Sequence, residues 1–182
     1  TRTCTYLFTD LRGFTSMSEK LSPQEVTEIM NATLSVQVTA VQKYGGMVDK
    51  FIGDAIMVIF GAPTPLLPKE QALRAAACAK EMQAKMVDLN ERWNEEDIPT
   101  LKMRIGIHSG TVVAGVVGKK KFAYDLFGDT INTASRMESA GQSGKINISS
   151  STFELVKDEF NCIPRGKVFV KGKGELDMYF VE

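Results

Sequence analysis

The sequence predicts an α+β fold: a ferredoxin-like βαββαβ core with appended helices and a C-terminal β-hairpin. Short stretches alternate apolar and polar residues, which is typical of half-buried strands. Two longer segments carry apolar residues at helical spacing. These segments follow one another in the order strand, helix, hairpin, helix, strand, which is the ferredoxin-like pattern.

The first half of the chain supplies the first strand, a helix and a hairpin. Tyr6 to Phe8 are the centre of an apolar strand, and the pattern Ser22-Pro23-Gln24-Glu25 is a capping box with proline at the first helical position. Two apolar runs joined by Gly53-Asp54 predict a β-hairpin. The expected elements are a strand at about 3–9, a loop at 10–15, a helix from Ser22 to Gly45, and strands at 47–52 and 55–60.

The second half begins after a proline-rich loop with the longest helical pattern of the chain. Alternation then predicts two strands, which Ser109-Gly110 would join as a second hairpin. A turn at Lys171-Gly172-Lys173-Gly174 separates the last two strands. The expected elements are a helix at about 70–93, strands at 101–107 and 111–117, a helix at 129–139, a strand at 146–149, a helix at 151–156 and a final hairpin.

Composition is that of a globular protein. The chain has 182 residues, 43% of them hydrophobic and 24% charged, with 22 basic and 22 acidic side chains. A single domain over 1–182 can therefore bury a sufficient core. The net charge of zero predicts no nucleic acid partner and no membrane contact from this segment.

Location and context follow from the cysteines and the apolar runs. Cys4, Cys78 and Cys162 are odd in number and widely spaced, which favours a reducing, cytoplasmic location. No apolar run approaches the ~20 residues that span a bilayer, and no signal-peptide pattern opens the sequence. Because a core strand begins within a few residues of Thr1, we expect the segment to come from a longer protein with attached regulatory domains.

Two carboxylates are the first candidate site. Asp10 follows the expected central strand, and Asp54 lies at the tip of the expected neighbouring hairpin. Two carboxylates that approach each other repel, unless one is protonated or a cation lies between them, and oxygen ligands of this kind favour Mg²⁺. Gly13, followed by Phe14 and Thr15, would let backbone N–H groups approach a phosphate. The alternative is that both aspartates are ordinary turn residues.

Five motifs, in this order, resemble the class III nucleotidyl cyclase catalytic domain, and together they cover nearly the whole chain. They are FTDLRGFT at 8–15, FIGDAIM at 51–57, RIGIHSG at 104–110, GDTINTASRM at 128–137 and VKGKG at 170–174. The resemblance implies a metal site at Asp10, Leu11 and Asp54 that holds two Mg²⁺ or Mn²⁺ ions. It further implies attack of a nucleotide 3′-hydroxyl on its own α-phosphate, which releases pyrophosphate and a 3′,5′-cyclic monophosphate.

The resemblance also assigns side chains to the substrate. Asn132 and Arg136 are four residues apart and share a helix face; the family pattern gives Asn132 the ribose and Arg136 the charge that develops at the α-phosphate. Lys171 matches a triphosphate lysine, and Lys120 falls near a phosphate-binding arginine of some members. The alternatives are a solvated helix face for Asn132 and Arg136, a charged strand edge for Lys171 and a solvated turn for Lys120.

The base is expected to be adenine. The two positions that select the base in this family fall on Lys50 and Asp125. An ammonium faces the N1 acceptor of adenine and a carboxylate its N6 donor, whereas guanine reverses both groups and would leave them unpaired. Guanylyl members typically carry Glu and a small residue such as Cys at these positions. The sequence therefore predicts ATP as substrate and cyclic AMP as product.

In the family, one chain supplies the metal aspartates and its partner the base-reading, Asn, Arg and Lys residues. This sequence carries both sets, so we expect a head-to-tail homodimer with two shared sites. Three other readings stay open: a guanylyl or dual-specificity cyclase, a palm-type nucleotidyl transferase, for which no GGDEF string is present, and a catalytically silent nucleotide-binding dimerisation module. His108, on the outward side of its strand, is not expected to act in catalysis.

Overall fold

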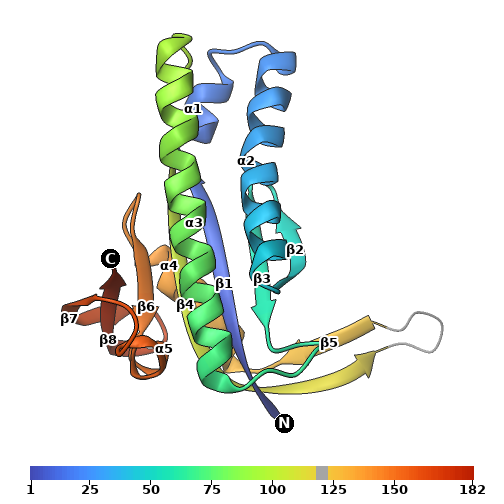
Figure 1. Ribbon diagram of the computed structural model, residues 1–182, viewed down its shortest axis with the longest axis vertical. Helices are drawn as coiled ribbons and strands as arrows, with labels where there is room; N and C mark the ends of the chain where they lie inside the picture. The colour runs from blue at the N-terminus through green and yellow to red at the C-terminus, as the bar shows by residue number, and fades with distance from the viewer. Residues whose placement is uncertain (118–122) are drawn as a thin grey trace.

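The computed structural model describes residues 1–117 and 123–182, and these form one twisted sheet with helices on both faces (Figure 1). The strand order is β2-β3-β1-β4-β6-β8-β7, and β5 pairs with β4 off this path. The elements are β1 (Arg2–Arg12), α1 (Phe14–Ser18), α2 (Pro23–Lys43), β2 (Met47–Ile52), β3 (Ala55–Phe60), α3 (Pro68–Glu95), β4 (Lys102–Val117), β5 (Ala123–Phe127), α4 (Asp129–Ser139), β6 (Ile146–Ser149), α5 (Ser150–Val156), β7 (Cys162–Val170) and β8 (Gly174–Val181).

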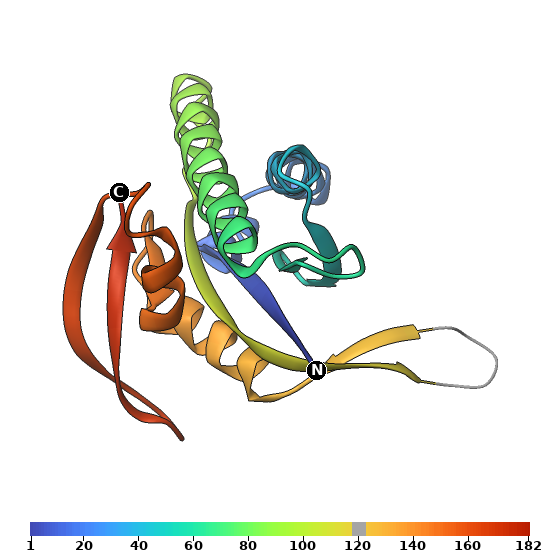
Figure 2. The same ribbon diagram turned by 60° about the horizontal axis from the view of Figure 1, so that its bottom comes forward.

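Alternation along the central strand β1 gives the sheet two buried faces. Leu7 and Leu11 belong to a core that α2 and α3 cover, whereas Cys4 and Tyr6 lie in a second core with Ala134 of α4. Figure 2 shows α3 and α4 on opposite sides of β4. In both views the C-terminal end of β4 runs away from the body together with β5, as a two-stranded arm. The predicted α+β class is therefore confirmed.

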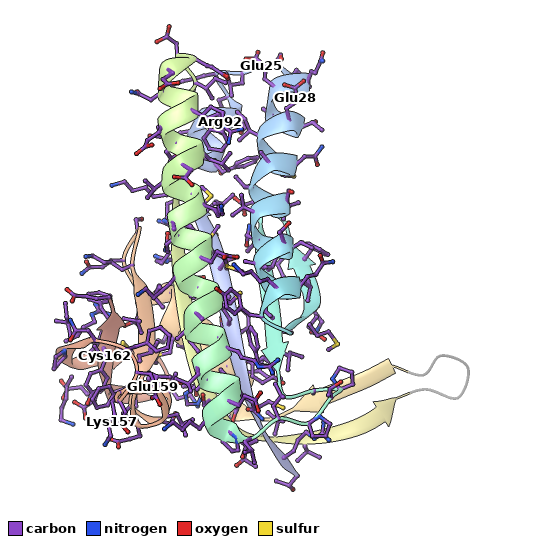
Figure 3. All side chains as sticks on the ribbon, viewed as in Figure 1. Glu25, Glu28, Arg92, Lys157, Glu159 and Cys162 are labelled. Carbon is purple, nitrogen blue, oxygen red and sulfur yellow. The ribbon has the colours of Figure 1, made fainter. Side chains whose placement is uncertain are left out.

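Helix α2 begins where the sequence predicted, whereas α3 begins at Pro68, two residues before the expected start. The Ser22 hydroxyl accepts a hydrogen bond from the Glu25 N–H, and the Glu25 carboxylate accepts one from the Ser22 N–H, so the capping box is complete. Glu25 and Glu28 project from the exposed end of α2 in Figure 3. No helix in the parts of the chain described above is long and apolar enough to cross a membrane.

The predicted hairpin at Ser109-Gly110 is wrong. Both residues lie inside the continuous strand β4, opposite Thr5 and Cys4 of β1, and the Ser109 hydroxyl lies 2.7 Å from that of Thr5. A serine-glycine pair permits a turn, but β1 offers it backbone partners on either side of that point. The hairpin forms instead between β4 and β5, a strand that the sequence analysis did not predict.

The first strand is longer than expected. Asp10 lies within β1, not in a loop, because β4 pairs with β1 as far as Arg12 opposite Lys102. The short helix α1 then follows directly, and it too was not predicted. Consequently Asp10 is held by the sheet itself.

Helix α4 packs unusually close to the sheet because β4 carries a glycine beneath it. A Cβ on Gly106 would lie 2.0 Å from the backbone nitrogen of Glu138 and 2.4 Å from the carbonyl carbon of Met137. No side chain fits there. This contact fixes the height of α4 above β4, and with it the place of Asn132 and Arg136.

Candidate active site

Asp10 lies at the end of β1 on the α4 side of the sheet. Its Oδ2 atom is 3.3 Å from Nη1 of Arg12 and 3.6 Å from Nη2 of Arg104, its cross-strand neighbour on β4. The Asp10 side chain is 26% exposed, so a ligand can still reach the carboxylate. The guanidinium groups of Arg12 and Arg104 therefore partly neutralise the negative charge of Asp10.

Asp54 lies at the turn between β2 and β3, after Gly53, whose φ of 61° places it in the left-handed region. Burial raises the pKa of the Asp54 carboxyl, and the negative charge of Asp10 raises it further. The two carboxylates are thus close enough to interact electrostatically. We call Asp10 and Asp54 the carboxylate pair.

The donor atoms of the carboxylate pair suit a hard divalent cation. All are oxygens. The pKa of Asp54 is raised mainly by burial and further by the negative charge of Asp10, and a cation between the two groups would relieve that repulsion. The Leu11 side chain is apolar and only 5% exposed, so only its main-chain carbonyl oxygen can be a ligand. Among residues 1–117 and 123–182, no group of three or more His, Cys, Asp or Glu side chains is placed to hold a metal. In proteins, Mg²⁺ is usually bound by one or two carboxylates, together with water and substrate phosphates.

The loop after β1 turns sharply into α1. Gly13 has a φ of 93° and precedes the first helical residue, and its carbonyl accepts a hydrogen bond from the Met17 N–H. Phe14 is half-buried, whereas Thr15 is exposed. Backbone N–H groups at the start of α1 thus lie just beyond Asp10 in the chain.

A cavity of about 470 Å³ lies between α4 and the turn that joins β7 to β8. It is lined by a second set of predicted residues, those assigned to the substrate: Asn132, Arg136 and Lys171. Asn132 and Arg136 lie on the exposed face of α4, while Thr133, Ala134 and Met137 are buried on the other face. The cavity is polar and open to solvent, and it is lined by Asp129, Asn132, Ser135, Arg136, Lys171, Gly172 and Lys173. We call it the α4 cavity.

An ion pair holds the turn against the helix. Lys173 contacts the Asp129 carboxylate at the start of α4 and is itself largely covered, whereas Lys171 is exposed and free to turn toward the cavity. The sequence analysis assigned no role to Asp129 or Lys173. Their signal was present in the sequence, since each stands two or three residues from a predicted site residue.

The two sets do not meet within one chain. Neither Asp10 nor Asp54 lines the α4 cavity. Arg104 connects Asp10 with α4: its Nε lies 2.5 Å from Oε2 of Glu138 on α4, and its Nη2 lies 3.6 Å from Oδ2 of Asp10. The side chains of Arg104 and Glu138 are 17% and 14% exposed. Arg104 appeared in the sequence analysis only as part of a motif; its charge among alternating apolar residues was the available signal.

The predicted base-reading residues come from two hairpins. Lys50 lies on β2, exposed and opposite Met57 of β3, just after an irregularity in register at Val48. Asp125 lies on β5 opposite Gly115 of β4. Lys120, the third predicted residue of this part of the chain, lies outside the described residues.

His108 does not line the α4 cavity. Its Nδ1 is 2.6 Å from the Ser149 hydroxyl and 3.2 Å from that of Ser151. Burial, and secondarily the charge of Lys173, lowers its pKa to about 4. The ring is therefore neutral near pH 7 and tied to hydroxyl groups.

Comparison with known proteins shows the family of this chain. A sequence profile of the adenylate and guanylate cyclase catalytic domain matches residues 1–182. Guanylate cyclase 32E of Drosophila melanogaster is 38% identical over 97% of this chain and 15% of its own length. The crystal structure of the adenylyl cyclase CyaB from P. aeruginosa superposes with a TM-score of 0.92 at 36% identity, covering 99% of this chain and 93% of that one. The guanylate cyclase domain of RhGC from Catenaria anguillulae, solved with GTP, has a TM-score of 0.85 at 33% identity, covering 99% and 96%.

The chain therefore belongs to the family of adenylate and guanylate cyclase catalytic domains, the class III nucleotidyl cyclases. Membership removes the palm-type transferase from the open readings. The relatives include both adenylyl and guanylyl cyclases. The chain spans 15% of the length of Guanylate cyclase 32E and 28% of that of the human guanylate cyclase soluble subunit beta-2, which is 37% identical to it.

Proposed function

We propose that this chain is an adenylyl cyclase domain that converts ATP to 3′,5′-cyclic AMP and pyrophosphate in a site shared by two copies. The observation that carries the proposal is the presence, on one chain, of both the carboxylate pair and the α4 cavity at separate places. Each is half of what the reaction needs. A second copy, turned head to tail, would bring the carboxylate pair of one chain to the α4 cavity of the other.

The reaction is an internal displacement at phosphorus. A bond forms between the ribose 3′-oxygen and the α-phosphorus, the bond from that phosphorus to the oxygen of the β-phosphate breaks, and the hydroxyl proton passes to solvent. Two Mg²⁺ or Mn²⁺ ions, when bound at Asp10, Leu11 and Asp54, would polarise the hydroxyl and neutralise phosphate charge. The remaining work is positioning and charge stabilisation by the protein.

Three residues of the α4 cavity have roles that their placement supports. The Arg136 guanidinium, exposed on α4, can bind two phosphate oxygens at once and stabilise the charge that grows at the α-phosphate. Asn132, one helical turn earlier, can hold the ribose. Lys171, at the rim of the cavity, can bind the β- and γ-phosphates as an exposed positive charge. Gly13, Phe14 and Thr15 would present backbone N–H groups to the same triphosphate, and Lys120 is proposed as a further phosphate contact.

The choice of ATP rests on Lys50 and Asp125. A lysine donates to the N1 acceptor of adenine, and an aspartate accepts from its N6 amino group, whereas GTP would leave both side chains unpaired. GTP is the second candidate, because several similar proteins are guanylate cyclases by name, and one was solved with GTP. Attached regulatory domains are also proposed, since the curated relatives are several times longer than this chain.

A turnover assay tests the function directly. Residues 1–182 are incubated with ATP or GTP at equal concentration and with Mg²⁺ or Mn²⁺, and cyclic nucleotide and pyrophosphate are measured by chromatography. We expect cyclic AMP from ATP, no product with EDTA, and a loss of at least ~100-fold in Asp54→Asn. Asp88→Asn, which removes an exposed carboxylate on α3, is the matched control and should retain full activity.

The outcomes separate the readings. Cyclic GMP as the main product would favour the guanylyl cyclase, and nucleotide binding without turnover would favour the silent module. A wild-type rate in Asp54→Asn would overturn the metal site. If the base assignment is right, the double variant Lys50→Glu with Asp125→Cys should shift turnover from ATP toward GTP.

A further inference from the structure

The strands that carry the carboxylate pair separate just before the two aspartates. Pairing between β1 and β3 ends at Phe8 opposite Met57, whereas pairing between β1 and β4 continues to Arg12. Asp10 and Asp54 both lie beyond the last paired residues of β1 and β3. The ordinary backbone ladder therefore does not set the distance between the two carboxylates.

Beyond the end of that ladder, the side chain of Thr9 connects β1 to β3. The Thr9 hydroxyl accepts a hydrogen bond from the backbone N–H of Ile56 at 3.1 Å, and it donates one to Oε1 of Gln37 on α2 at 2.5 Å. Thr9 is 2% exposed and Gln37 is fully buried. Thr9 immediately precedes Asp10, and Ile56 follows Asp54 by two residues. The hydroxyl thus joins β1, β3 and α2 at the base of the carboxylate pair.

Glutamine at position 37 lowers the stability of the fold. Its neighbours on the inner face of α2 include the buried Ile29, Ala40 and Val41, and its Nε2 atom has no hydrogen-bond partner among the described residues. A buried amide group without a partner destabilises a fold by about 1–3 kcal/mol, and an apolar side chain would avoid that loss. Stability alone therefore does not account for glutamine here, whereas holding the Thr9 hydroxyl in one orientation does.

We infer that Thr9 and Gln37 are positioning residues that fix the separation of Asp10 and Asp54 for metal binding, and that they couple this separation to the place of α2. The inference rests on the proposed metal site at the carboxylate pair. Without the hydroxyl, the β3 end of the hairpin can move away from β1, because the last backbone pair lies at Phe8 and Met57. A change in the separation of the two carboxylates should weaken the binding of Mg²⁺ more than that of Mn²⁺, because Mg²⁺ demands near-ideal octahedral geometry.

The test measures binding of Mn²⁺ alone, by the electron paramagnetic resonance signal of the free ion, and then cyclase activity with each metal. Thr9→Val keeps the shape of the side chain and removes the hydroxyl, and Thr9→Ser restores the hydroxyl. We expect Mn²⁺ binding to weaken about fivefold in Thr9→Val, the factor that one net hydrogen bond supplies, and to stay within about twofold in Thr9→Ser. The ratio of Mg²⁺-supported to Mn²⁺-supported activity should fall in Thr9→Val only.

The matched control is Thr5→Val. Thr5 is also a fully buried threonine of β1 on the same face, but its hydroxyl contacts Ser109 of β4, not β3. It should lose comparable stability in urea and bind Mn²⁺ as the wild type does. Should Thr9→Val fail to fold, Gln37→Met removes the same hydrogen bond from the helix side, with the same expected fall in Mn²⁺ affinity.

The results distinguish this inference from the function on which it rests. Wild-type Mn²⁺ affinity and an unchanged metal ratio in the folded Thr9→Val or Gln37→Met variant would overturn the positioning role, even with Asp54→Asn inactive. Equal weakening in Thr5→Val would overturn it too, because the effect would then be general destabilisation. Mn²⁺ affinity that Asp54→Asn leaves intact would instead refute the metal site itself.

Discussion

Mixing two inactive variants tests whether the carboxylate pair and the α4 cavity come from different chains. Asp10→Ala removes one member of the carboxylate pair, and Arg136→Ala removes a charge from the α4 cavity. In a mixed dimer, one shared site contains both defects, and the other contains neither. Each variant alone should be inactive, whereas the mixture should regain activity.

The size of the recovery follows from the geometry. Random exchange of equal amounts of the two chains makes about half of the dimers mixed, and each mixed dimer has one intact site of two. The mixture should therefore reach about one quarter of the wild-type activity per chain. A recovery well above that value would mean that mixed dimers form preferentially.

The assay is cyclic AMP production after the two chains are unfolded together and refolded, with one chain tagged so that mixed dimers can be isolated and counted. Asp10→Ala mixed with Asp54→Ala is the matched control. Both defects then lie in the same half of the site, so every site keeps one defect and no activity should return. Isolated mixed dimers of Asp10→Ala and Arg136→Ala that stay inactive would refute the shared site.

Two further predictions concern stability. Burial lowers the pKa of His108 from 6.5 to about 4, so the unfolded chain binds a proton in this window that the folded chain does not, and stability falls as the pH falls from 6.5 toward 4. In His108→Asn, the free energy of unfolding measured in urea should fall by up to about 3 kcal/mol less between pH 6.5 and pH 4 than in the wild type. The same pH dependence in both proteins between pH 4 and 7 would contradict the buried neutral ring. Gly106→Ala should lower the free energy of unfolding by about 2 kcal/mol or more, because its Cβ meets the α4 backbone at 2.0 Å; a loss below about 0.5 kcal/mol in urea would show that α4 can move away.

Local signals in the sequence determined most of the elements. The capping box at Ser22 and Glu25 places the start of α2, and the turn at Gly53 places the hairpin between β2 and β3, because both signals act within a few residues. The motifs then gave the family, which the comparisons show, and they gave the candidate residues of the site. Their roles remain predictions.

Only the tertiary structure decided how these pieces are arranged. Ser109-Gly110 looks like a turn locally, but β1, about a hundred residues earlier, pairs with it and keeps β4 a continuous strand. The same long-range pairing keeps Asp10 in a strand beside Arg104, and it leaves Thr9 to join β3 and α2 where the ladder ends. Such contacts depend on which distant strand lies alongside, and no window of neighbouring residues contains that information.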